Sequence, residues 1–167
     1  MTRLSNPNIL RLGAGAGYAG DRIPPAVALA EKGQLDYLIF ECLAERTIAL
    51  AQLEKLKNPQ GGFDPLLRAR MQAVLPACMA NSTRIITNMG AANPLQAGRE
   101  VLAVARELGI DRLKVAVVLG DDVLALLQSN YLSELLIDSK QTVAEIQPLL
   151  VSANAYLGAE ALLPALQ

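Results

Sequence analysis

Short apolar runs alternate with amphipathic stretches along most of this chain of 167 residues. The apolar runs predict five strands, at 8–12, 35–40, 83–87, 113–119 and 149–152. The stretches with helical spacing of apolar residues predict helices at 24–31, 44–57, 65–78, 94–108, 123–132 and 159–166, and residues 133–148 stay open. Strands that alternate with helices form parallel βα units with right-handed crossovers. We therefore predict an α/β fold with a mostly parallel, open, doubly wound Rossmann-like sheet, and a partial βα barrel as the alternative.

The end of the sequence falls inside a helical pattern. The last predicted helix, 159–166, is followed only by Gln167, with no capping glycine and no charged tail. We expect residues 1–167 to form a single α/β domain that is incomplete at its C-terminus. An incomplete sheet leaves an unpaired edge and apolar surface. We therefore expect a second copy of the chain, or a partner subunit, to cover that edge.

The composition excludes several classes of function. Lys and Arg number 15 against 16 Asp and Glu, so the basic excess of a nucleic-acid or anionic-membrane binder is missing. The absence of histidine excludes Ser-His or Cys-His catalysis and His-ligated metal sites within this chain. No run approaches the length of a transmembrane helix, and residues 1–7 have no apolar region of signal-peptide length, so we expect neither a membrane span nor a signal peptide. Cys42 and Cys78 are not spaced like the ligands of a metal site, so we interpret them as reduced thiols of a cytoplasmic protein.

Glycine, a carboxylate or a carboxamide follows every predicted strand. Ligands of parallel sheets bind at the carboxyl ends of the strands, so we expect one polar cleft for a small-molecule substrate there. The carboxylates Asp21, Glu41 and Asp121 are the candidates for general acid–base catalysis. The candidate substrate-binding residues are Gly15, Gly17, Gly20, Arg22, Asn88, Asn93 and Asn154. The three asparagines would orient a carbonyl or hydroxyl group.

The first glycine-rich loop offers an alternative function. Gly15, Gly17 and Gly20 fit the GxGxxG pattern of dinucleotide-binding proteins, and Glu41 stands where a ribose-binding acid would be. A dinucleotide-binding oxidoreductase module is therefore an alternative. Two features count against it: an acid at Asp21 repels phosphate, and the prolines at 24–25 remove two backbone donors from the start of the helix.

Two further groups have a structural and a chemical interpretation. Asp121 and Asp122 would hold Mg²⁺ together with Asp21 or Glu41, but a cap on the helix near Val123 is the favoured interpretation, so no metal site is predicted. Cys42 would serve as a nucleophile, but no histidine is present to act as its base. A buried thiol is therefore favoured there.

Five segments, taken together and in this order, resemble the acyclic terpene utilisation family of AtuA-type proteins. They are residues 11–22, 35–47, 87–94, 120–123 and 152–159, with the sequences RLGAGAGYAGDR, LDYLIFECLAERT, TNMGAANP, GDDV and SANAYLGA. The resemblance extends from about residue 8 to residue 159.

The resemblance implies a role in the bacterial catabolism of acyclic terpenes such as citronellol and geraniol, which proceeds through branched acyl-CoA intermediates. It implies a small-molecule substrate, such as an acyl-CoA, and leaves the reaction and any cofactor unknown. Family members are longer and continue into a Thr-Gly-Arg-Val-Ala-Asp type motif that is absent here, so the chain resembles their N-terminal part. A truncated, non-catalytic accessory subunit is therefore a further alternative.

Overall fold

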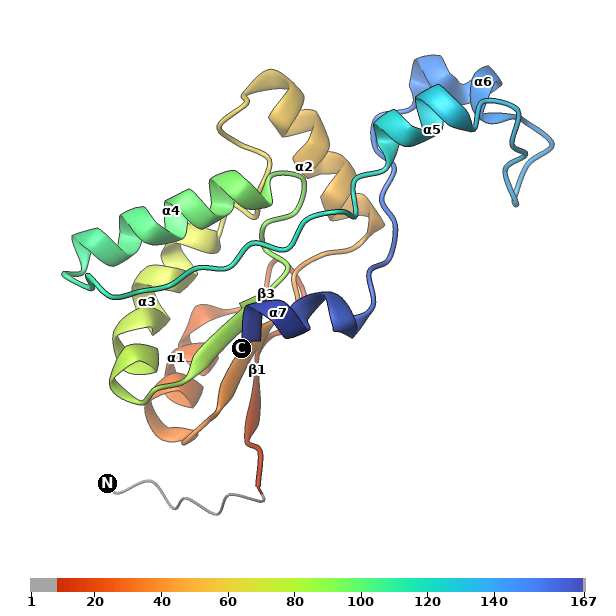
Figure 1. The fold of residues 1–167 in the computed structure, drawn as a ribbon. Coiled ribbons are helices and arrows are strands. Elements are labelled where there is room, and N and C mark those ends of the chain that lie inside the picture. The colour runs from red at the N-terminus through yellow and green to blue at the C-terminus, as the bar shows by residue number, and fades with distance from the viewer. Residues whose placement is uncertain (1–8, 167) are drawn as a thin grey trace. The chain divides into compact units, whose positions relative to one another are not determined.

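The computed structural model describes residues 9–166. The chain divides into two compact units, Met1–Val115 and Ala116–Gln167, and each is described by itself. The helices and strands of the first unit, in chain order, are β1 (Leu12–Ala16), α1 (Ile23–Lys32), β2 (Tyr37–Phe40), α2 (Glu45–Lys57), α3 (Leu67–Ala80), β3 (Arg84–Thr87) and α4 (Pro94–Glu107) (Figure 1).

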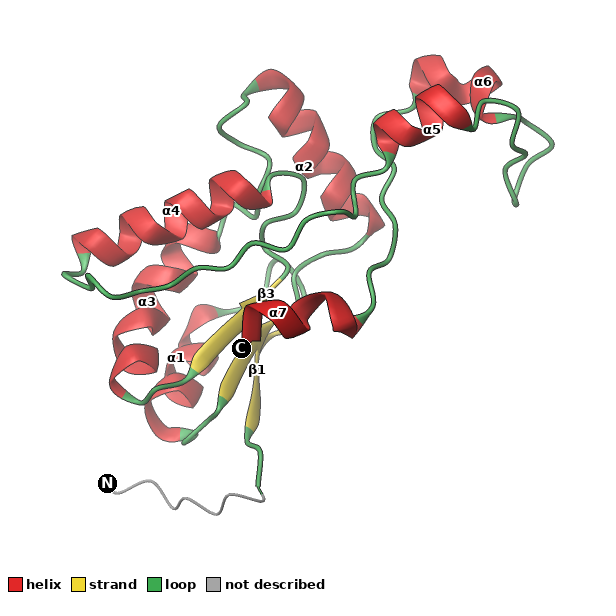
Figure 2. Ribbon diagram, in the orientation of Figure 1, coloured by secondary structure: helices red, strands yellow, loops and turns green. Residues whose placement is uncertain are grey.

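The three strands form an open parallel sheet in the order β1-β2-β3 (Figure 2). Leu12 of β1 lies opposite Tyr37 of β2, which lies opposite Arg84 of β3. The α/β class, with an open parallel sheet of βα units, is confirmed. Because all three strands run the same way, their carboxyl ends meet at one edge of the sheet.

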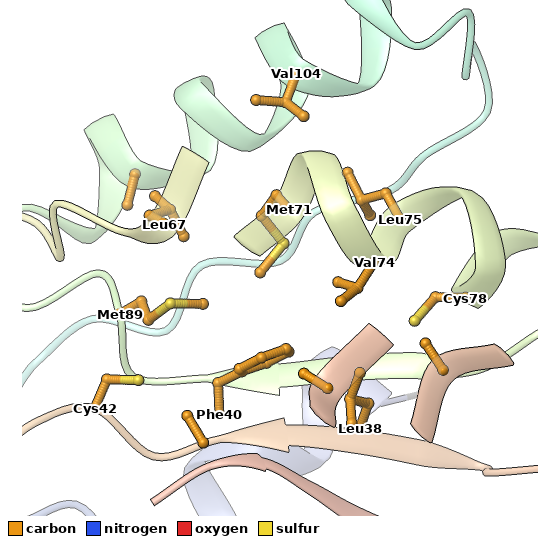
Figure 3. Packing of buried hydrophobic residues seen from close by; sticks show 14 of the residues in the cluster. Leu38, Phe40, Cys42, Leu67, Met71, Val74, Leu75, Cys78, Met89 and Val104 are labelled. Carbon is orange, nitrogen blue, oxygen red and sulfur yellow. The ribbon is translucent and has the colours of Figure 1, made fainter. Parts of the chain in front are cut away.

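The core of the first unit lies between β2 and the helices α1 and α3. Leu38 and Phe40 of β2 point at α3, which presents a stripe of buried apolar residues (Figure 3). That stripe consists of Leu67, Met71, Val74, Leu75 and Cys78. The helix α1 packs on β1 and on α3, and α4 packs on the far side of α3. By contrast α2 has no buried residue.

The position of β1 differs from the prediction. Residues 9–11 form no strand, Asn8 lies outside the described residues, and the strand runs through the glycines at 13 and 15 instead. A Cβ atom at Gly15 would lie 2.7 Å from the Phe40 ring. The small residues let β1 lie against its neighbours, so the glycines belong to the strand rather than to the turn that ends it.

The second unit contains short helices and no strand of the sheet within the described residues. Its elements are α5 (Leu124–Asn130), α6 (Val143–Ile146), two 3₁₀-helices (Gln147–Leu149 and Ala159–Leu162) and α7 (Leu163–Leu166). The strands predicted at 113–119 and 149–152 are therefore wrong. Residues 113–119 have no regular secondary structure, and the start of the second run is taken up by a 3₁₀-turn that contains Pro148.

No helix in residues 9–166 is long and apolar enough to cross a bilayer.

Candidate functional site

Three loops follow the strands at the carboxyl edge of the sheet, and we call them the strand-end loops. They are residues 17–22 after β1, 41–44 after β2 and 88–93 after β3. The predicted site residues of the first unit, Gly15 apart, lie in these loops. Gly15 lies within β1, where the Phe40 ring occupies the space a side chain would need.

Glu41 and Asn88 come together at the ends of β2 and β3. The Asn88 side-chain amide donates from Nδ2 to Glu41 Oε1 at 2.9 Å. Its Oδ1 accepts from the backbone N–H of Cys42 at 2.7 Å. The same Glu41 oxygen also accepts from the Leu43 backbone N–H at 2.9 Å. One carboxylate oxygen is thus fixed by two donors, and within residues 9–166 none of the hydrogen bonds reaches Oε2.

The Asp21 carboxylate accepts hydrogen bonds from the backbone of its own loop. Its Oδ2 accepts from the Gly17 backbone N–H at 3.1 Å, and its Oδ1 accepts from that of Arg22 at 2.8 Å. These two backbone donors, with smaller contributions from the charges of Arg22 and Arg70, hold the pKa of Asp21 below its usual value.

The geometry of this loop differs from a phosphate-binding loop. Backbone N–H groups that would face a pyrophosphate point at Asp21 instead, and α1 starts with proline in its first turn. The Arg22 side chain is exposed. Gly20 lies against the ring of Tyr18, whereas a Cβ on Gly17 would meet no atom within 4 Å. The loop therefore fits a self-contained turn better than a dinucleotide cradle.

Arg70 is the residue that the sequence analysis missed. It lies on α3, 1% exposed, and forms a buried ion pair with Asp64 at 3.3 Å. Its guanidinium also donates to the carbonyl oxygens of Ala19 and Asp21, at 2.8 and 3.0 Å, and to the sulfur of Cys42 at 3.2 Å. The sequence did contain a sign of this burial, because Arg70 lies on the same face of α3 as the buried apolar residues, three positions after Leu67 and four before Val74.

Asn93 has a structural role in the loop between α2 and α3. Its Nδ2 donates to the carbonyl oxygens of Pro59 and Gly61, at 3.0 and 2.7 Å. Both amide hydrogens are thereby used within the protein. Asn93 precedes α4 as expected, but its side chain forms no cap hydrogen bond with that helix.

Asp121 and Asn154 belong to the second unit, where they pair with each other. Asn154 Nδ2 donates to Asp121 Oδ2 at 3.0 Å, and an antiparallel bridge links Asp122 with Asn154. Asp122 Oδ1 accepts from the backbone N–H of Leu124 at 3.2 Å, close to the start of α5, in keeping with the capping interpretation. Within residues 9–166, no group of three or more Cys, Asp or Glu side chains is arranged to hold a metal ion.

Both cysteines are free and buried. Burial raises the pKa of each thiol to about 11, and for Cys42 the charge of Arg70 opposes that rise. The interpretation of Cys42 as a buried thiol is confirmed, and Cys78 is a buried thiol as well.

Comparison with known proteins assigns the family. No curated protein and no solved structure matches the chain. The sequence model of the acyclic terpene utilisation family protein AtuA matches residues 10–167, which is nearly the whole chain and includes both units. The chain belongs to the AtuA family of acyclic terpene utilisation proteins.

Proposed function

We propose that this chain acts in the catabolism of acyclic terpenoid or branched acyl compounds and binds a small-molecule substrate at the strand-end loops. Family membership supports the substrate class. One observation supports the location: Asn88 and the Leu43 backbone fix one oxygen of the exposed Glu41 carboxylate and leave the other open. The carboxyl edge of a parallel sheet is also where α/β proteins bind ligands.

Glu41 is the group that would act on the substrate. A carboxylate held at one oxygen can accept a hydrogen bond or a proton from a substrate hydroxyl at the other. Asn88 holds the carboxylate in that orientation, and Tyr18, 60% exposed in the neighbouring loop, offers apolar contact area for a branched chain. Asp21 supports the fold of its own loop, since two backbone donors already hold its carboxylate.

The test is a calorimetric titration of a branched acyl-CoA into three proteins: the unchanged chain, Glu41→Gln and Glu31→Gln. Glu31 is an exposed carboxylate at the C-terminal end of α1, whereas the strand-end loop 17–22 precedes the N-terminal end of that helix. Glu31→Gln therefore serves as the matched control. Loss of affinity in Glu41→Gln alone supports the proposal. Equal affinity in all three proteins contradicts the assignment of Glu41.

The dinucleotide alternative has weaker support. The Gly17 and Arg22 backbone donors point at Asp21, and a phosphate group would have to displace that carboxylate. The same titration with NAD and NADP separates the two functions, because NAD or NADP should bind only if the chain is a dinucleotide-binding module.

A second candidate is an accessory subunit that binds a partner, or a second copy of itself, at the open edge of the sheet in the cytoplasm. Among residues 9–166 no fourth strand joins β3, so both outer strands are sheet edges. Leu12 of β1 is 58% exposed, and Leu56 of the unburied helix α2 is 66% exposed. Such edges and apolar surfaces favour association. Light scattering at high concentration tests this candidate, and a stable monomer contradicts the self-association form.

A further inference from the structure

The guanidinium of Arg70 lies where the three strand-end loops meet. Arginine is almost never fully buried unless it is paired, and Asp64 on the turn before α3 supplies the pairing charge. Asp64 is itself buried and is held in place by the Leu66 backbone N–H, which donates to its Oδ1 at 2.7 Å. The pair is therefore a fixed feature of the core and not a surface contact.

Each strand-end loop supplies at least one acceptor to this guanidinium. The loop after β1 supplies the carbonyl oxygens of Ala19 and Asp21 to Nη2. The loops after β2 and β3 supply the sulfur atoms of Cys42 and Met89 to Nη1, at 3.2 and 3.5 Å. One side chain thus connects three segments that are far apart in the sequence.

All of these loop acceptors except that of Ala19 belong to a polar residue of the candidate site or to the residue that directly follows one. Cys42 follows Glu41, Met89 follows Asn88, and Asp21 is itself one of the acceptors. A shift of the guanidinium would therefore move these groups together.

Stability alone does not explain why this residue is arginine. A buried ion pair can often be replaced by well-packed apolar side chains without loss of stability. What apolar side chains cannot supply is a rigid fork of donors that reaches several acceptors in different directions. The arrangement of acceptors around Arg70 uses that property.

We propose that Arg70 is the positioning residue of the site, whose guanidinium holds the three strand-end loops in register and so fixes Asp21, Glu41 and Asn88. The proposal rests on the proposed function in one respect, namely that these loops form the binding site. The effect on the loops themselves is testable without any ligand.

The test uses the full chain in four forms: unchanged, Arg70→Met, Arg70→Lys and Arg68→Met. Arg68 lies on the same helix, and its ion pairs with Glu100 and Glu107 join α3 to α4 away from the loops. It is the matched control for loss of an arginine from α3. Nuclear magnetic resonance follows the amide signals of Gly17 and Arg22 and the titration of the Asp21 carboxyl carbon.

We expect Arg70→Met and Arg70→Lys to shift and broaden the two amide signals and to raise the pKa of Asp21 toward its ordinary value. Lysine keeps the charge but lacks the planar fork, so a change in both variants assigns the effect to the fork. Arg68→Met should leave these signals in place. Folded Arg70 variants with unchanged loop signals would overturn the proposal. Failure of both variants to fold would also overturn it, because Arg70 would then serve stability alone.

Binding separates this proposal from the proposed function. If branched acyl-CoA binds, the folded Arg70 variants should bind it about 10-fold more weakly, which corresponds to a loss of about 1.4 kcal/mol of binding free energy. If the loops change but no acyl-CoA binds the unchanged chain, the proposed function fails and the positioning role stands. If acyl-CoA binding depends on Glu41 but neither the loops nor the affinity respond to Arg70, the positioning role fails.

Discussion

Asn88 joins the ends of two neighbouring strands through Glu41: its Nδ2 lies 2.9 Å from Glu41 Oε1 while its Oδ1 accepts from the Cys42 backbone N–H at 2.7 Å. A single side-chain amide therefore fixes both the Glu41 carboxylate, which we propose contacts the substrate, and the backbone that follows it. The arrangement depends on β2 and β3 being adjacent and parallel, with Phe40 opposite Thr87.

Replacement of Asn88 by alanine removes both hydrogen bonds. At about 1 kcal/mol for each, the free energy of unfolding should fall by about 2 kcal/mol. Urea denaturation followed by circular dichroism measures this change. Asn130→Ala, at the exposed end of α5, is the control and should change stability by less than about 0.5 kcal/mol. An Asn88→Ala midpoint equal to that of the control would contradict the linking role of the amide.

The hydrogen-bonded Asp21 carboxylate should make the stability of the chain sensitive to acid. Its pKa is lowered in the folded chain, so the carboxylate contributes stability above its ordinary pKa of 3.8, and that contribution is lost as the pH falls through the folded pKa. The melting temperature of the unchanged chain should fall more steeply below pH 4 than that of Asp21→Asn. Parallel curves for the two proteins between pH 5 and pH 2 would show that the Gly17 and Arg22 donors do not stabilise the carboxylate.

The glycines at 15 and 17 should respond differently to the same substitution. A Cβ at Gly15 would lie 2.7 Å from the Phe40 ring, so Gly15→Ala should lower stability by about 1–3 kcal/mol through overpacking. At Gly17 a Cβ meets nothing within 4 Å, and Gly17→Ala should be tolerated. Phe40→Leu should offset part of the Gly15→Ala effect in the double variant. Equal effects at the two positions would refute the packing explanation.

The two thiols should be unreactive in the folded chain. Burial raises the pKa of Cys42 and Cys78 to about 11, so neither is appreciably ionised at pH 8. A disulfide exchange reagent should modify both cysteines rapidly in denaturant and only slowly without it. A fast-reacting thiol in the native chain would contradict the burial of these residues.

Local pattern was sufficient for the elements whose buried residues form a clear apolar run or stripe. The continuous apolar run at 35–40 and the stripe on α3 lead directly to β2 and to the core between them. The glycines of β1 could not be placed, because a glycine in a turn and a glycine under the Phe40 ring look alike in sequence. The apolar run at 113–119 resembles a strand, but strand formation also requires a partner that the run itself does not specify.

The part of the candidate site that could be predicted is the part that follows from the order of the strands. Glu41 and Asn88 follow adjacent parallel strands, so their meeting follows from the strand order. Which partners a polar side chain finds depends on nearby backbone atoms, and this is why the hydrogen bonds of Asn93 to Pro59 and Gly61 could not be predicted from the sequence. Arg70 was not predicted as a site residue because a charged side chain in a helix is usually exposed to solvent.

The most direct test of the central claim is a thermal unfolding scan of the chain with a saturating branched acyl-CoA, NAD, NADP or Mg²⁺, repeated with Glu41→Gln. A ligand at 100 times its dissociation constant stabilises the native state by about 2.7 kcal/mol, which is easily detected. The account predicts stabilisation by the acyl-CoA, its loss in Glu41→Gln, and no change with either dinucleotide. Stabilisation by NAD or NADP, or an acyl-CoA effect that Glu41→Gln leaves intact, would contradict it.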